Sequence, residues 1–185
     1  LGLIHGLATT AARLGFYLRR WTKVVNVMIY KEPGNYNLDK LRVIHLFEAD
    51  FNLIVGILFG RRVMHHAHNN NLLHDGQGWR LGSECMDVTF TKILHITMSH
   101  LTKTPLGLFE SDAEACFDRI VMLMAFLAFK SLGAPAKPLQ MWEQTLYHVR
   151  HVLRTGFGES MHFYDYSSAC PIIGPGQGSR GGVAA

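Results

Sequence analysis

Asp112 carries the strongest signal for chemistry, because it follows a short apolar run and opens the segment Asp112–Asp118 (DAEACFD). An acid where a strand finishes presents its carboxylate at the edge of a sheet, and a carboxylate there can hold Mg²⁺ against a nucleoside triphosphate. That arrangement would support nucleotidyl transfer. Taken alone, Asp112 could instead be a helix N-cap, since an apolar helical pattern follows it and Asp caps helices well.

Three other segments carry polar residues at defined spacings, and two of them also contain glycines. They are Leu41–Asn52 (LRVIHLFEADFN), Gly76–Asp87 (GQGWRLGSECMD) and Gly174–Ser179 (GPGQGS). With DAEACFD, these segments resemble core motifs of reverse transcriptases, and they occur in the order of that family. The resemblance is to the enzymes of retrotransposons without long terminal repeats (non-LTR), and it covers most of the chain from Trp21 onward.

The resemblance implies a role in nucleotide binding for several residues. Asp112 takes the place of the ligand for Mg²⁺, with Mn²⁺ as the alternative ion. Phe117 takes the place of the aromatic residue that presses against the sugar of the incoming nucleotide. Arg42 corresponds to the arginine that contacts the triphosphate, while Gln177 and Gly178 would shape the pocket for base and template.

An RNA template, a DNA primer and deoxynucleoside triphosphates are the partners that this resemblance implies. Arg80 and Lys103 are expected to contact the template. The net charge of +4, from 18 basic and 14 acidic residues, is compatible with phosphate contacts but is too small to identify them. The competing hypothesis is a catalytically dead retroelement relic that acts at most as a nucleic-acid-binding or interaction domain. A P-loop at the terminal glycines is disfavoured, because a P-loop needs Lys followed by Ser or Thr after its last glycine, and Arg180 is followed by glycines.

The chain departs from the family pattern near its end. Arg180, Gly181 and Gly182 follow the Gln-Gly-Ser triplet, and the paired aspartates of the third palm motif are absent. Two-metal transfer holds its ions about 3.5–4 Å apart, and a single carboxylate cannot coordinate both of them. We therefore expect the sequence to be a fragment that is inactive by itself.

The expected fold class is α/β (α+β), with an antiparallel sheet packed on helices as in a right-hand polymerase. Residues 1–99 would form a fingers-like region and residues 100–185 a truncated palm. Apolar patterns and turn residues predict strands and helices along both regions. The strands are Val24–Tyr30, Leu41–Leu46, Leu106–Glu110 and Ser160–Ser167, and the helices begin near Phe47, Glu84, Ile120 and Leu139.

Composition adds limits on cofactors and location. The three cysteines are far apart, which disfavours a zinc ribbon and favours a reducing intracellular compartment, the nucleus or cytoplasm. Histidines 65, 66 and 68, and the pair 148 and 151 at helical spacing, lack accompanying acids or cysteines and are interpreted as surface or core residues. The longest apolar stretch, Ile120–Phe129, is too short to span a membrane, for which about twenty residues are needed.

Overall fold

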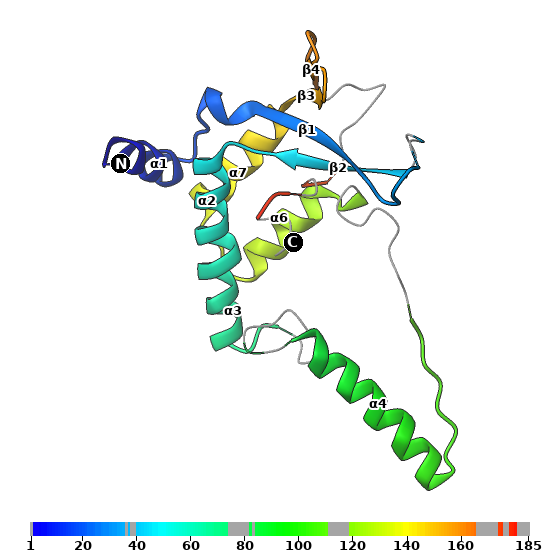
Figure 1. Cartoon of the computed structure of the whole chain (residues 1–185). Helices are drawn as coiled ribbons and strands as arrows, with labels where there is room; N and C mark the ends of the chain where they lie inside the picture. The colour runs from blue at the N-terminus through cyan, green and yellow to red at the C-terminus, as the bar shows by residue number, and fades with distance from the viewer. Residues whose placement is uncertain are drawn as a thin grey trace.

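The computed structural model (Figure 1) describes residues 2–35, 37, 40–73, 82, 84–110, 119–165, 174–175 and 178–180. Two strands follow the N-terminal helices, and a series of helices then leads to three further strands. The elements are α1 (Gly2–Leu14), η1 (Arg19–Thr22), β1 (Lys23–Tyr30), β2 (Leu41–Leu46), α2 (Ala49–Val55), η3 (Gly56–Val63), α3 (Met64–Asn69), α4 (Cys85–Thr102), α6 (Met122–Ser131), α7 (Ala136–Tyr147), β3 (Arg150–Thr155), β4 (Gly158–Glu159) and β5 (Tyr164–Asp165). The predicted α+β class is confirmed.

The first two strands, which the sequence predicts to be joined by a hairpin or a loop, form a hairpin. β-branched and apolar residues dominate both strands, which suits a half-buried pleated surface. β1 and β2 pair antiparallel, with Met28 opposite Val43. Gly34 adopts a φ of +81° in the connection, a conformation that glycine allows without a steric penalty.

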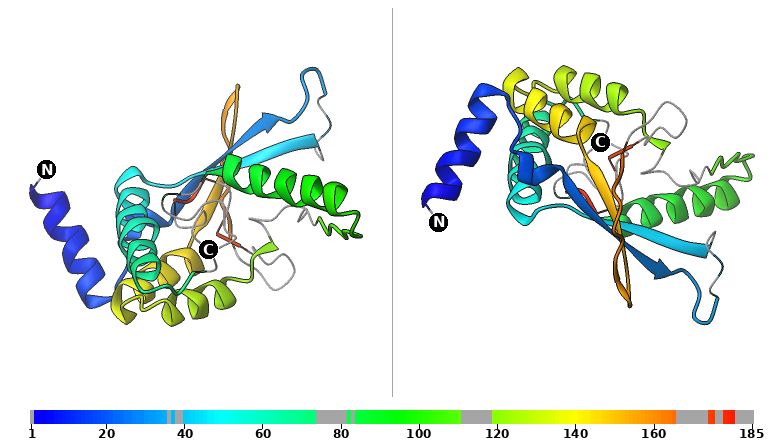
Figure 2. Two further views of the ribbon diagram at one scale, coloured as in Figure 1. Left: turned by 90° about the horizontal axis from the view of Figure 1, so that it is seen from below. Right: turned by 90° about the horizontal axis from the view of Figure 1, so that it is seen from above.

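The sheet is mixed, whereas a wholly antiparallel sheet was predicted. Its strand order is β2-β1-β3-β4, and β5 also pairs with β3. The difference lies in the central pair, because β1 and β3 run parallel, with Val25 opposite Val152. Figure 2 shows β1 beside β3 from two sides. The chain between these strands supplies α2 to α7, and a long helical crossover of this kind is what parallel pairing requires.

β3 lies where the sequence predicted the end of a helix, Leu139–Leu153. Helix α7 ends at Tyr147, and the chain becomes extended at Arg150. Val149 and Val152 favour extended backbone, and a neighbouring strand is available to satisfy the backbone hydrogen bonds of this segment. The helical prediction was therefore correct for the first part of the segment and wrong for the second.

Leu106–Glu110 does not form the predicted strand. The structure assigns it no regular structure, and its residues are exposed. It follows α4, and Glu110 forms an ion pair with Lys92 of that helix. Within the described part of the chain, no strand pairs with this segment, so its apolar residues lack the sheet partner that the prediction assumed.

The elements α2, η3 and α3 form a continuous helical run from Ala49 to Asn69, close to the predicted helix. Phe51, Val55, Phe59 and Val63 form a buried stripe along it. These residues recur every fourth position, a longer interval than the α-helical repeat of about 3.6 residues. In a regular α-helix, residues four positions apart would therefore shift gradually around the helix axis. The i→i+5 turns of η3 are wider than α-helical turns and offset this shift, so that the four side chains stay on one face.

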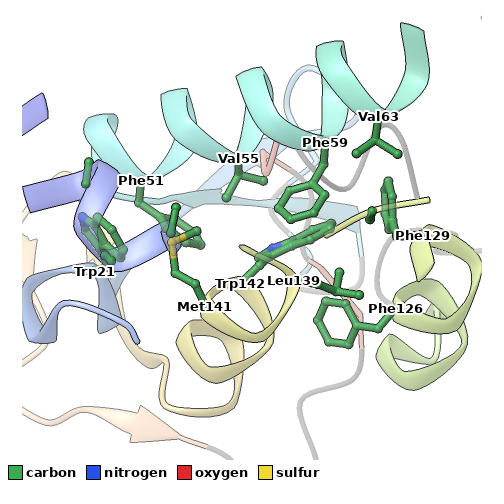
Figure 3. Packing of buried hydrophobic residues seen from close by; sticks show 14 residues of the cluster. Trp21, Phe51, Val55, Phe59, Val63, Phe126, Phe129, Leu139, Met141 and Trp142 are labelled. Carbon is green, nitrogen blue, oxygen red and sulfur yellow. The ribbon is translucent and has the colours of Figure 1, made fainter. Parts of the chain in front are cut away.

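This stripe packs against α6 and α7 to form the hydrophobic core (Figure 3). Trp142 of α7 lies at the centre, with its ring centroid 4.6 Å from that of Phe59 and 5.2 Å from that of Phe129. Alanines of α1 and Trp21 of η1 complete the cluster. Residues from 1–99 and from 100–185 thus share one core and one sheet.

Helix α4 forms close to its predicted position and projects away from the sheet and core (Figure 1). A capping box at Glu84 and Asp87 begins the helix, and Lys103 ends it in a left-handed conformation. None of its residues is buried. In the described part of the protein, no helix is both long enough and apolar enough to cross a membrane.

Candidate functional site

Gly178 lies against the backbone of β2. Its φ is +119°, and a Cβ added there would lie 2.4 Å from the carbonyl oxygen of His45. Such a contact is far shorter than van der Waals separation, so the backbone can approach β2 this closely only with glycine at this position. The structure therefore joins two motifs that are distant in the sequence, GPGQGS and LRVIHLFEADFN.

Asn52 forms the polar link between these two motifs. Its Nδ2 donates to the carbonyl oxygen of Gly178 at 3.1 Å, across 126 positions of the chain. Its Oδ1 accepts from the backbone N–H of Arg180 at 2.8 Å. One amide side chain thus satisfies a backbone acceptor and a backbone donor on either side of Ser179, which is itself buried.

Two glycines of the helical run accommodate the same segment. A Cβ at Gly56 would lie 2.8 Å from Cδ of Arg180, and a Cβ at Gly60 would lie 3.6 Å from the carbonyl oxygen of Arg180. Asn52, Gly56 and Gly60 recur at every fourth position, as the core stripe does. The helical run therefore presents one stripe to the core and a neighbouring stripe to residues 178–180.

A buried polar cluster lies on the sheet beside this contact. His151 of β3 is 3.2 Å from Asn26 of β1, Nδ1 to Oδ1. The Nδ2 of Asn26 donates to the hydroxyl of Tyr164. His151 stacks on Tyr164 with ring centroids 5.3 Å apart, and the ring of His45 is 5.2 Å from that of His151. The cluster thus extends across four strands, from β2 to β5.

Burial and charge repulsion perturb the titration of this cluster. Burial, and secondarily the neighbouring His45, lower the pKa of His151 from 6.5 to about 4. Burial also raises the pKa of Tyr164, against the opposing effect of the hydrogen bond from Asn26. His151 is therefore neutral at physiological pH, and both side chains are in the uncharged form that burial favours.

A cavity of about 190 Å³ lies between this cluster and the helices. Most of its lining is apolar, and the lining includes Gly174 and Pro175 of the GPGQGS motif. The remaining lining residues are His45, Phe47, Val121, Met122, Leu123, Phe126, Glu143, Leu146, Tyr147, Val149 and His151. Both ends of the GPGQGS motif therefore contact the region where β2 ends, one at Pro175 and the other at Gly178.

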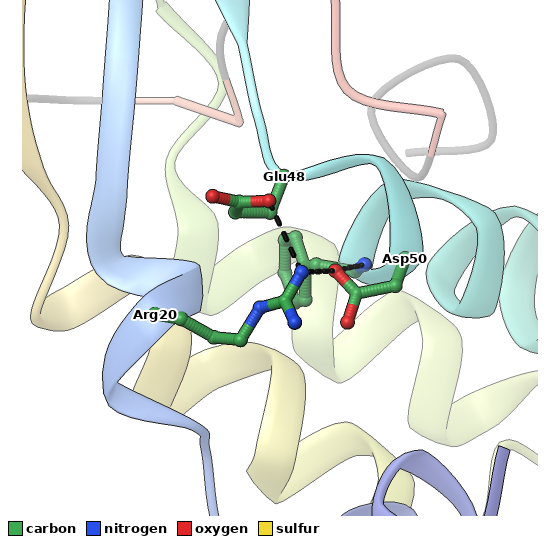
Figure 4. Close-up of polar contacts among 4 residues, drawn as sticks. Arg20, Glu48 and Asp50 are labelled. Atoms are coloured by element: carbon green, nitrogen blue, oxygen red, sulfur yellow. Dashed lines mark hydrogen bonds and ion pairs between the residues drawn. The ribbon is translucent and has the colours of Figure 1, made fainter. Parts of the chain in front are cut away.

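An ion-pair network fixes the corner between β2 and α2 (Figure 4). Nη2 of Arg20 lies 3.3 Å from Oε2 of Glu48 and 3.3 Å from Oδ1 of Asp50. The acids also precede and open helix α2, where the helix dipole favours negative charge. Arg20 thus ties η1 to the segment from which Asn52 projects.

The structure describes three of the predicted site residues. Arg42 is exposed on β2, opposite Ile29, and Gly178 contacts the same strand at His45. Lys103 ends α4, far from β2 (Figure 1), so the structure does not bring it beside Arg42. Asp112, Phe117, Gln177 and Arg80 lie outside the described residues.

The described ranges hold no group of three or more His, Cys, Asp or Glu side chains that could bind a metal ion. Asp112 is not among them, so the proposed Mg²⁺ ligand rests on the family resemblance. His148 and His151 do not share a helix face, because His148 follows α7 and His151 lies on β3. The i, i+3 spacing of these two histidines therefore does not place their side chains on one helix face.

Sequence reasoning did not single out Asn52, Gly56 or Gly60. Asn52 lies inside a recognised motif, and its position next to buried Phe51 could have been noted as a polar residue at the edge of an apolar stripe. The glycines within an otherwise apolar helix also signal close backbone approach. Neither signal identifies the partner, because residues 178–180 are distant in the sequence.

No protein-family model matches the chain, and a search of curated proteins finds no match.

Proposed function

We propose that the chain is part of a reverse transcriptase that adds deoxynucleotides to a primer on an RNA template. The observation that carries this proposal is the contact between the GPGQGS motif and the β2–α2 motif through Asn52 and Gly178. A nucleotide-binding pocket needs such an arrangement, because residues that contact base and phosphate must converge from different parts of the chain. The order of the motifs in the sequence supports the same assignment.

In this proposal, each motif contributes one part of the pocket. Arg42 on β2 contacts the triphosphate through its guanidinium, which suits phosphate oxygens. Gly178 allows the backbone to approach β2 closely, and Gln177, which precedes it in the sequence, would contact base and template through its amide. Asp112 supplies one oxygen ligand, and Mg²⁺ would neutralise the charge of the phosphates. Further carboxylates from the third palm motif are needed to hold two ions.

Primer extension tests the proposal. A form of the protein that includes the third palm motif is incubated with an RNA template, a DNA primer, deoxynucleotides and Mg²⁺. We expect templated extension that Asp112→Asn reduces by at least about 10³-fold, because a lost metal ligand removes several kcal/mol of charge stabilisation. Asp165→Asn, which removes an exposed carboxylate on β5, is the matched control and retains activity.

The competing hypothesis of a catalytically dead relic predicts a different result. A relic would bind primer–template with the salt dependence of phosphate contacts but would extend no primer in any form. Extension that is unaffected by Asp112→Asn would show instead that Asp112 is a helix cap and that the palm assignment is wrong.

A further inference from the structure

We propose that Asn52 is a positioning residue for nucleotide selection, which holds the turn at residues 178–180 in register with β2. This inference rests on the proposed function. Asn52 is not expected to touch the nucleotide. Its two hydrogen bonds, to the carbonyl oxygen of Gly178 and the N–H of Arg180, set the position of the turn.

The chemistry of the link is specific to an amide side chain. The turn offers an acceptor at Gly178 and a donor at Arg180, so its partner must both donate and accept. An aspartate at position 52 would still accept from Arg180 but would place a charged oxygen against the carbonyl of Gly178. A leucine of similar size would satisfy neither group. Asparagine is thus the side chain of this length that satisfies both.

Packing makes the position of the turn equally specific. Gly178 touches the carbonyl oxygen of His45 on one side, and Arg180 occupies the space over Gly56 on the other. Ser179 between them is 3% exposed. A shift of the turn along the helical run would break these contacts and expose Ser179.

The link connects the two parts of the proposed pocket. Gln177 directly precedes Gly178, while Arg42 lies three residues before His45 on β2. Because Asn52 holds Gly178 over His45, it also sets the position of residues 178–180 relative to the strand that carries Arg42. Arg20, through Glu48 and Asp50, holds the corner from which Asn52 projects.

The experiment compares Asn52→Asp and Asn52→Leu with unmodified protein that includes the third palm motif. Asn69→Leu is the matched control, since Asn69 belongs to the same helical run and its side chain contacts His65 of that run. Two measurements are made on each protein. Amide hydrogen exchange at Arg180 reports on the turn, and steady-state primer extension gives KM for the deoxynucleotide, kcat and the frequency of misincorporation.

In Asn52→Leu, the N–H of Arg180 loses its hydrogen bond to the side chain of residue 52. We expect amide exchange at Arg180 to accelerate by about tenfold or more, because the free energy of one hydrogen bond corresponds to a change on that scale. Exchange within α7 should stay unchanged. KM for the deoxynucleotide should rise about tenfold and misincorporation should increase, while kcat changes less than threefold. Asn52→Asp should retain slow exchange at Arg180 but share the rise in KM. Asn69→Leu should alter neither measurement.

Unchanged exchange at Arg180 in Asn52→Leu would overturn the anchoring role. Faster exchange with unchanged KM and misincorporation would overturn the role in nucleotide selection. An equal fall in kcat for every nucleotide, with KM unchanged, would show a merely structural residue. If unmodified protein extends no primer, the proposed function fails and nucleotide selection fails with it, while exchange at Arg180 still decides whether Asn52 anchors the turn.

Discussion

His151 donates a hydrogen bond from Nδ1 to Oδ1 of Asn26 on the neighbouring parallel strand, over 3.2 Å. The direction follows from Asn26, whose Nδ2 is already directed at Tyr164, so that its Oδ1 can only accept. This fixes His151 as the neutral tautomer that carries a proton on Nδ1. Burial, and secondarily the neighbouring His45, disfavour a second proton on this imidazole and lower its pKa.

Acid should therefore destabilise the fold through His151. Its pKa is about 4 in the folded protein and 6.5 in the unfolded chain, so below pH 6.5 the unfolded state binds a proton that the folded state excludes. The free energy of unfolding should fall as pH drops from 6.5 to about 4, by up to about 1.4 kcal/mol per pH unit from this residue. Above pH 6.5 its contribution is fully present.

Urea denaturation at pH 7 and pH 5 measures this effect. His151→Gln should remove most of the loss between the two pH values, since glutamine can donate to Asn26 but does not titrate. His162→Gln, at an exposed position, is the control and should leave the pH dependence unchanged. Equal pH dependence in His151→Gln and unmodified protein would contradict the prediction.

Trp142 should be the most costly core residue to truncate. It is fully buried and contacts the rings of Phe59, Phe126 and Phe129. Trp142→Ala should lower the free energy of unfolding by about 3–5 kcal/mol, as measured by chemical denaturation. Phe157→Ala, at a fully exposed ring, should change it by less than about 0.5 kcal/mol.

Trp142→Phe should cost much less than Trp142→Ala. The indole N–H of Trp142 is buried and has no hydrogen-bond partner among the described residues. Its removal would relieve a desolvation penalty of about 1–3 kcal/mol, which offsets part of the cavity left by the smaller ring. A loss of stability as large as that of the alanine variant would indicate that the N–H is satisfied in solution.

The Arg20 network should contribute little to global stability. Arg20 and Glu48 are about half exposed, so solvent screens their attraction. Arg20→Gln should lower the free energy of unfolding by less than about 1 kcal/mol, and the difference should shrink in 1 M salt. A double-mutant cycle with Glu48→Gln measures the coupling. A coupling well above 1 kcal/mol that persists in salt would show that the pair is less hydrated than its exposure indicates.

Arg42 should affect nucleotide binding and leave the fold intact. Its side chain is exposed on β2, and the described residues provide no acidic partner for it. In primer extension, Arg42→Ala should raise KM for the deoxynucleotide by about 10–100-fold, since charge-assisted hydrogen bonds contribute about 1.5–3 kcal/mol. Lys40→Ala, a basic residue next to β2, is the control and should change KM less than threefold. Equal increases in KM for both variants would indicate that the nucleotide is attracted by positive charge in general and not bound by Arg42 in particular.

Local patterns determined much of the fold. The β-branched runs at β1 and β2, with Pro33 and Gly34 between them, predicted the hairpin correctly. The apolar periodicity from Phe51 onward predicted the long helical run, and the asparagines at its end predicted where it stops. These signals succeed because turn chemistry and the helical repeat are properties of a few adjacent residues.

Tertiary structure decided what the local signals left open. The segment from Arg150 to Thr155 has a helix-compatible pattern, but it became a strand because β1 offered it a parallel partner. Leu106–Glu110 has a strand-like pattern but found no partner among the described strands. Strand formation depends on a neighbour that can be distant in the sequence, so pattern alone could not separate these two cases.

The same division holds for the candidate site. The sequence by itself singled out Gly178 and the segment Leu41–Asn52 as parts of two motifs with a predicted role in nucleotide binding. Only the folded chain showed that Asn52 joins them, and that Gly178 must be glycine because the carbonyl of His45 lies where a Cβ would be. A hydrogen bond between residues 126 positions apart leaves no periodicity in the sequence, because it depends on how the helical run and the sheet pack against each other.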